Sequence, residues 1–113
     1  MSLTLDEIKS IQKNFDLTHS VNGKGFYVTI NEQNIHELEH LAVCLTGEIG
    51  EFCNLLKKVV RGDLELSEIK SNMGEELADC FIYLMKIANQ FDVDIESEFI
   101  KKVNYNKKRY DEI

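Results

Sequence analysis

Four acidic residues form two pairs with the same spacing. Glu48 and Glu51 are three residues apart, and Glu76 and Asp79 repeat that spacing further along the chain. Side chains three residues apart project from one face of an α-helix, so each pair predicts a clamp of two carboxylates. Apolar residues recur around both pairs at helical intervals, which predicts that the clamps border a packed interface between helices.

Such a cluster would favour a divalent cation. Carboxylates at a half-buried helix interface repel one another and lose hydration, and a metal ion removes that penalty. Oxygen ligands without histidine or thiolate favour magnesium, manganese or calcium over zinc or copper. The alternative is solvated surface acids, in a chain that has 20 Asp and Glu residues. Two pairs beside apolar seams favour a metal site formed by Glu48, Glu51, Glu76 and Asp79.

Two further residues lie near the predicted site. Tyr83 is one helical turn beyond Asp79, where its hydroxyl could orient a carboxylate or contact a nucleotide; a half-buried core tyrosine explains it equally well. His40 precedes Glu48 by two turns and lies close to the same face. It is a candidate contact to a base or a sugar, or simply a rim residue. Both remain open as substrate contacts.

A basic face is predicted near the C-terminus. Lys102, Asn106 and Arg109 recur at helical spacing and offer a cation, an amide and a guanidinium on one side. That face could bind phosphates, although Lys and Arg near a helix C-terminus also complement the helix dipole without any ligand. No glycine-rich phosphate loop follows a strand, and no serine or cysteine has the neighbours of an activated nucleophile. Covalent catalysis is therefore not expected.

Amphipathic helices must position these residues. The first is predicted over residues 5–17, after a capping box formed by Thr4 and Glu7. The second is predicted to start at an Asn34 N-cap and to end at Arg61-Gly62. Its apolar residues hold the seven-residue spacing typical of helices that pack lengthwise.

Two more helices follow. Ser67 is predicted to cap the third, which extends to about residue 91, and Asp92 or Asp94 opens a fourth that runs close to the C-terminus. The chain contains no proline that would interrupt them. Four amphipathic segments predict an all-α fold, an antiparallel four-helix bundle that forms a single domain over residues 1–113.

The connection between the first two helices is long. Residues 18–33 contain a turn-like stretch, Asn22-Gly23-Lys24-Gly25, and then the β-prone run Phe26–Ile30. Loops of this length are uncommon in small domains unless they are functional or disordered. The segment is therefore interpreted either as a lid or base-contacting element or as a mobile loop.

Composition narrows the function classes. The chain has 113 residues, a formal charge of −7 and three cysteines without a metal-binding or disulfide pattern. The negative charge argues against nucleic-acid binding, and no apolar run is long enough to span a membrane. We expect a cytoplasmic protein that binds neither nucleic acid nor membranes and contains reduced thiols.

The motifs resemble those of a known family. The segments Leu45–Phe52 and Glu75–Asp79, together with Tyr83, resemble the MazG-like nucleotide pyrophosphohydrolases. The likeness spans roughly residues 35–110 and includes the basic face on the last helix. The N-terminal third matches poorly, and Gly47 stands where many members carry a further glutamate.

The resemblance implies an activity. The chain would hydrolyse a nucleoside or deoxynucleoside triphosphate between the α and β phosphates, with Mg²⁺ as cofactor and Mn²⁺ as a substitute. Glu48, Glu51, Glu76 and Asp79 would hold the metal, with Glu51, and secondarily Glu48, acting on the attacking water. The substrate would be bound by Lys102, Asn106, Arg109, Tyr83 and His40. The resemblance also implies a homodimer or homotetramer.

Two other functions remain alternatives. One is a catalytically silent module that binds a nucleotide or a metal, and the other is an oligomerising helical protein with no ligand. Intact acidic pairs weigh against the first, and a stripe of carboxylates beside the packing seam has no purpose in the second.

Overall fold

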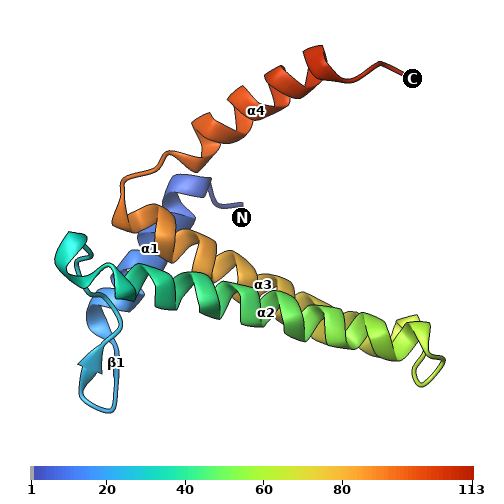
Figure 1. Ribbon diagram of the computed structural model, residues 1–113, viewed down its shortest axis with the longest axis horizontal. Helices are drawn as coiled ribbons and strands as arrows, with labels where there is room; N and C mark the ends of the chain where they lie inside the picture. The colour runs from blue at the N-terminus through green and yellow to red at the C-terminus, as the bar shows by residue number, and fades with distance from the viewer. Residues whose placement is uncertain (1) are drawn as a thin grey trace.

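The computed structural model describes residues 2–113 and places most of them in helices, which confirms the predicted all-α fold class. The four α-helices, shown in Figure 1, are α1 (Leu5–Thr18), α2 (His36–Val60), α3 (Leu66–Gln90) and α4 (Ile95–Arg109). None of the described helices is long and apolar enough to cross a membrane.

Helices α2 and α3 form a long antiparallel pair that is the main packing contact of the chain (Figure 1). The turn between them begins at Gly62, whose φ of 84° lies in the left-handed region that glycine adopts without strain. Both helices carry apolar residues at helical spacing, and α3 contributes the fully buried Ile69 and Met85. This pair carries both of the acidic pairs.

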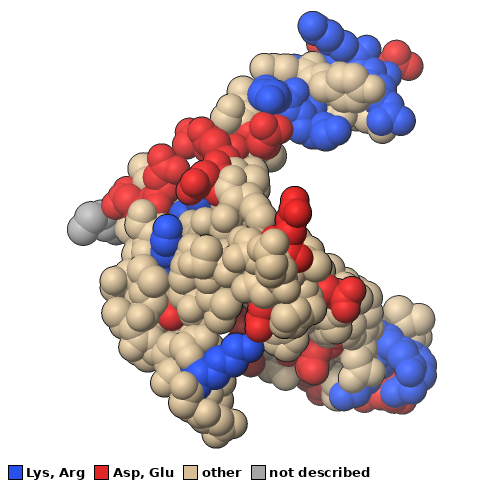
Figure 2. All heavy atoms as spheres, turned by 60° about the vertical axis from the view of Figure 1, so that its left-hand side comes forward, with Lys and Arg blue, Asp and Glu red and all other residues tan. Residues whose placement is uncertain are grey.

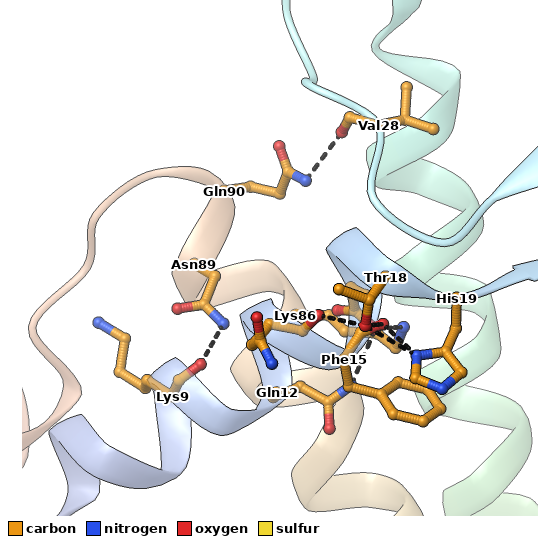
Figure 3. Close-up of polar contacts among 11 residues, drawn as sticks. Lys9, Gln12, Phe15, Thr18, His19, Val28, Lys86, Asn89 and Gln90 are labelled. Carbon is orange, nitrogen blue, oxygen red and sulfur yellow. Dashed lines mark hydrogen bonds and ion pairs between the residues drawn. The ribbon is translucent and has the colours of Figure 1, made fainter.

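Helix α1 packs across the C-terminal half of α3. Its N-terminus is capped as predicted, because the Thr4 hydroxyl accepts from the Glu7 N–H and the Glu7 carboxylate accepts from the Thr4 N–H. Between the two helices, Asn89 Nδ2 of α3 donates to the Lys9 carbonyl of α1 at 3.0 Å (Figure 3). Polar side chains of α3 therefore fix the position of α1.

The segment between α1 and α2 contains ordered elements in place of a plain loop. A short antiparallel hairpin joins β1 (Ser20–Val21) to β2 (Lys24–Gly25). Asn22 and Gly23 form its turn, with φ of 51° and 80°, the geometry that Asn-Gly favours in tight hairpins. The β-prone run Phe26–Ile30 is not a strand.

That run is bound by α3 instead. Gln90 Nε2 donates to the Val28 carbonyl at 2.8 Å, and Gln90 Oε1 accepts from the Ile30 N–H at 3.1 Å. One amide thus satisfies the backbone groups that a strand partner would have bound, and Figure 3 shows the Val28 contact. Ile30 is buried below it.

Two predicted N-caps were wrong. Asn34 does not cap α2, because a 3₁₀ turn, η1 (Glu32–Asn34), leads into the helix and is itself capped by Asn31. Ser67 does not cap α3, because the extended residue before Leu66 is Glu65, whose N–H donates to the Glu68 carboxylate at 3.0 Å. Helix α3 therefore begins upstream of its predicted cap, whereas α2 begins at His36, after the 3₁₀ turn that contains Asn34.

Helix α4 points away from the other three helices (Figure 1). Asp94 is its N-cap and accepts from the Ser97 N–H at 3.0 Å. Of the two residues predicted to open this helix, Asp92 and Asp94, the second is therefore the one used. Its apolar residues Phe99 and Ile100 are 63% and 52% exposed. The radius of gyration is 17.3 Å, whereas a compact domain of this length would have about 13 Å. Within one chain α4 therefore has an unpartnered apolar face.

Candidate functional site

Three of the four predicted acids lie together between α2 and α3. Glu48 of α2 and Glu76 and Asp79 of α3 each offer a carboxylate oxygen, and these oxygens lie within 4.8 Å of one another. All three side chains are half-buried. Antiparallel packing explains the arrangement, because it brings the middle of α2 against the middle of α3.

Glu76 is the most constrained of the group. Its Oε2 is buried and has no hydrogen-bond partner among the described residues. Burial, followed by the carboxylates of Glu51, Glu48 and Asp79, raises the pKa of Glu76. An unsatisfied carboxylate oxygen that faces other carboxylates is the environment that a cation would relieve. The donor set consists only of carboxylate oxygens, which suits a hard divalent ion such as Mg²⁺.

Glu51 lies beside this group and outside it. Its side chain is exposed, and it is not among the three residues whose oxygens converge. Its charge is nevertheless close enough to contribute to the raised pKa of Glu76. Glu51 therefore sits at the solvent side of the acidic group.

Tyr83 continues the site along α3. It is half-buried, and burial together with the neighbouring Cys44 thiol raises the pKa of Tyr83, with smaller contributions from Glu48 and Asp79. On α2, Cys44 Sγ lies 3.6 Å from Nε2 of the exposed His40. His40, Cys44 and Glu48 thus follow one face of α2, and Tyr83 lies opposite. Sequence reasoning missed Cys44, although its four-residue spacing to His40 and Glu48 was visible.

A cavity of about 430 Å³ opens next to Tyr83, between α1 and α3. Most of its wall is apolar, and two of its aromatic residues, Phe15 and Phe26, stack with ring centroids 6.0 Å apart. The residues that line the cavity are Ile11, Gln12, Phe15, Phe26, Ile82, Tyr83 and Lys86. Tyr83 had been singled out from sequence, and Phe26 belongs to the segment that was interpreted as a possible base-contacting element. The other residues meet only after α1 packs on α3.

A buried charge pair lies behind this cavity. Lys86 Nζ donates to Asp16 Oδ1 at 2.7 Å, and Gln12 Nε2 donates to the same oxygen at 2.9 Å. Gln12 and Lys86, both labelled in Figure 3, thus come from α1 and α3 to the same carboxylate. The Lys86 ammonium also lies over the rings of Phe26 and Tyr83, 5.3 and 5.9 Å from their centroids.

The predicted basic face lies elsewhere. Lys102, Asn106 and Arg109 are on α4, which extends away from the acidic group within one chain (Figure 1). Lys102 and Arg109 lie over the rings of their neighbours Tyr105 and Tyr110. Figure 2 shows Lys and Arg side chains gathered on α4, well separated from the body of the molecule. The structure does not bring these three residues to the acids of the same chain.

The fold and the site together define a helical domain with an acidic centre between two antiparallel helices. The chain belongs to the MazG nucleotide pyrophosphohydrolase domain family, whose model matches residues 36–112. The match begins at α2 and thus leaves α1 and the hairpin outside it.

Individual relatives are similar over the same part of the chain. The dCTP pyrophosphatase 1 of Mus musculus is 30% identical over 84 residues, and that of Homo sapiens is 28% identical over 82 residues. Each match covers 69% of this chain and 48% of the relative, so the chain spans about half the length of these curated relatives. The Gene 37 protein of Mycobacterium phage L5 is 30% identical over 80 residues, 69% of this chain and 70% of the relative. No solved structure matches the chain significantly.

Proposed function

We propose that this chain is a Mg²⁺-dependent pyrophosphohydrolase that converts nucleoside or deoxynucleoside triphosphates to monophosphates and pyrophosphate. The observation that carries the proposal is the buried, unpartnered Oε2 of Glu76 within a group of three converging carboxylates. Family membership supports the reaction type. Either observation alone would leave the reaction or the site undefined.

Glu48, Glu76 and Asp79 would hold the metal, with Glu51 as a fourth ligand at the exposed side. When bound, Mg²⁺, or Mn²⁺ in its place, would supply positive charge against the triphosphate and would polarise water. Glu51 is the residue best placed to orient or deprotonate the attacking water, because its carboxylate is beside the group and open to solvent. Glu48 supports that proton transfer from the half-buried side.

The nucleoside would occupy the cavity between α1 and α3. Tyr83 lines this cavity and also lies one turn from Asp79, a rise of about 6 Å along the helix, so one nucleotide can span both places. The cavity offers aromatic rings against which a base can stack. His40, on the facing helix α2, would contact the sugar.

Assembly would complete the phosphate site. The exposed apolar face of α4 requires a partner, and its basic residues match the negative charge of the α2–α3 body. We therefore propose a homodimer or homotetramer in which α4 of one copy brings Lys102, Asn106 and Arg109 to the acidic group of another copy. Those side chains would neutralise the polyphosphate.

The direct test is a panel of ribonucleoside and deoxynucleoside triphosphates incubated with Mg²⁺ or with chelator, with products separated by chromatography. We expect monophosphate and pyrophosphate only with the metal, and a loss of at least about a hundredfold in rate for Asp79→Asn. Glu39→Gln, an exposed acid of α2 outside the carboxylate group, is the matched control and should retain the rate. No turnover of any triphosphate would favour the silent binding module or the oligomerising protein.

A further inference from the structure

Hydrogen bonds to Asp16 fix the orientation of the two polar side chains of the α1–α3 cavity, Gln12 and Lys86. Asp16 is 3% exposed, and its Oδ1 accepts hydrogen bonds from both Gln12 and Lys86. Because a carboxylate accepts hydrogen bonds and cannot donate them, the Gln12 amide must turn its NH₂ group toward Asp16. Its Oε1 is thereby held on the opposite side of the amide, and it accepts no hydrogen bond from residues 2–113.

The Lys86 ammonium adds donors beside that acceptor. It has three N–H groups, one of which binds Asp16. The ammonium lies between the rings of Phe26 and Tyr83, which are themselves part of the cavity wall. Gln12 and Lys86 both line the cavity, so together they can offer a ligand one acceptor and two donors.

This pattern distinguishes among nucleobases. The pairing edge of cytosine presents two acceptors, O2 and N3, followed by the donor N4–H₂, which complements two donors followed by an acceptor. Uracil and thymine carry a donor at N3, so that group would face the ammonium, donor against donor. Guanine presents two donors and one acceptor, so its second donor would find no acceptor on Gln12 or Lys86. Adenine presents one donor and one acceptor, so one N–H of the Lys86 ammonium would stay unpaired. Buried donors and acceptors left without partners oppose binding, which makes such a wall selective.

We propose that Gln12 and Lys86, oriented by Asp16, are the specificity-determining residues of the nucleoside cavity and select cytosine bases. This rests on the proposed function, because it assigns the cavity to the base of the substrate. Gln12 binds the exocyclic amino group, and Lys86 binds the ring nitrogen and carbonyl. Asp16 is a positioning residue that fixes both.

The competing explanation is that the three residues only tie α1 to α3. If the three residues are only structural, their substitution should weaken the binding of all nucleotides alike. If they determine base specificity, substitution should change the ratio of the affinities for two bases. Lys86→Met leaves Asp16 without its cation and could unfold the domain. Gln12→Met removes the acceptor while keeping the Asp16–Lys86 ion pair, so it is the decisive variant. Lys9→Met is the control, because Lys9 ties α1 to the Val93 carbonyl outside the cavity.

The experiment is calorimetric titration of the full chain, with Mg²⁺, using deoxycytidine and deoxyuridine monophosphates. These ligands differ only in the groups that Gln12 and Lys86 would read. We expect the wild type and Lys9→Met to prefer the cytidine ligand by about tenfold, and Gln12→Met to bind both equally. No preference in the wild type, the opposite preference, no binding of either, or a preference that survives in Gln12→Met would each overturn the proposal.

The two proposals fail separately. A cytosine preference in binding without any triphosphate hydrolysis would contradict the enzyme activity and leave the base-reading pair intact. Triphosphate hydrolysis with equal binding of both monophosphates would contradict the base specificity of Gln12 and Lys86 and leave the enzyme activity intact.

Discussion

The ammonium of Lys86 on α3 lies 2.7 Å from the carboxylate of Asp16 on α1, and their side chains are only 15% and 4% exposed. This is the one ion pair among the described residues that joins two helices in the interior. An ion pair so far removed from water does little for stability as a whole, but losing one partner leaves an uncompensated charge.

Asp16→Ala should therefore lower the free energy of unfolding by about 3 kcal/mol, because the Lys86 ammonium would remain half-buried without its counter-charge. Urea unfolding followed by circular dichroism measures this directly. Lys101→Ala removes an exposed ion pair with Glu98 and should change the same quantity by less than about 1 kcal/mol. Equal losses in both variants would contradict the burial of the Asp16 pair.

Glu76→Gln should stabilise the metal-free protein. The pKa of Glu76 is raised by burial and by the neighbouring acids, so folding favours its protonated form. The wild type is then penalised as the pH rises from the unfolded-state pKa through the raised folded-state pKa, and the amide variant is not. Thermal melts in chelator at pH 4 and pH 7 should show the advantage of Glu76→Gln mainly at pH 7. A larger advantage of Glu76→Gln at pH 4 would contradict a raised pKa of Glu76 in the folded protein.

Magnesium should raise the melting midpoint of the wild type, because the ion binds the folded state and not the unfolded chain. Glu48→Gln should reduce that shift, and Glu39→Gln, the same change on the same helix away from the acidic group, should retain it. If the two variants responded alike, Glu48 would not be a metal ligand.

Phe99→Glu should dissociate the proposed oligomer. Phe99 is 63% exposed on α4, and among residues 2–113 α4 is absent from the main helix–helix contacts. Light scattering should give a mass of two or four times 13.1 kDa for the wild type and a lower multiple for the variant. Glu112→Gln, near the chain end, is a control that should leave the mass unchanged. A wild type that is monomeric at every concentration would refute the assembly.

The sequence predicted the features that depend on helical spacing. The periodic seams placed α2 and α3, and three acids selected by three-residue spacing do converge across that pair. The Thr4 and Asp94 caps were also readable, because each is a local contact of a side chain with a nearby N–H.

What depends on long-range packing was not predictable. Nothing in the sequence around Gln90 indicates that its amide binds the backbone of Val28 and Ile30, 62 and 60 residues away. For the same reason the Asp16–Lys86 pair and the cavity beside it were missed, because they exist only once α1 crosses α3. The separation of α4 from the acids could not be read from its amphipathic pattern, which is the same for a partner in another chain.

We propose that the carboxylate group of Glu48, Glu76 and Asp79 between α2 and α3 supports pyrophosphate release. The most direct measurement is the yield of monophosphate and pyrophosphate from deoxycytidine triphosphate and Mg²⁺ in the wild type, Glu48→Gln and Glu39→Gln. For both the wild type and Glu39→Gln we predict one pyrophosphate for each monophosphate released, at similar rates. For Glu48→Gln we predict a rate at least about a hundredfold lower. Deoxycytidine diphosphate and orthophosphate as products, or an undiminished rate in Glu48→Gln, would contradict this role of the carboxylate group.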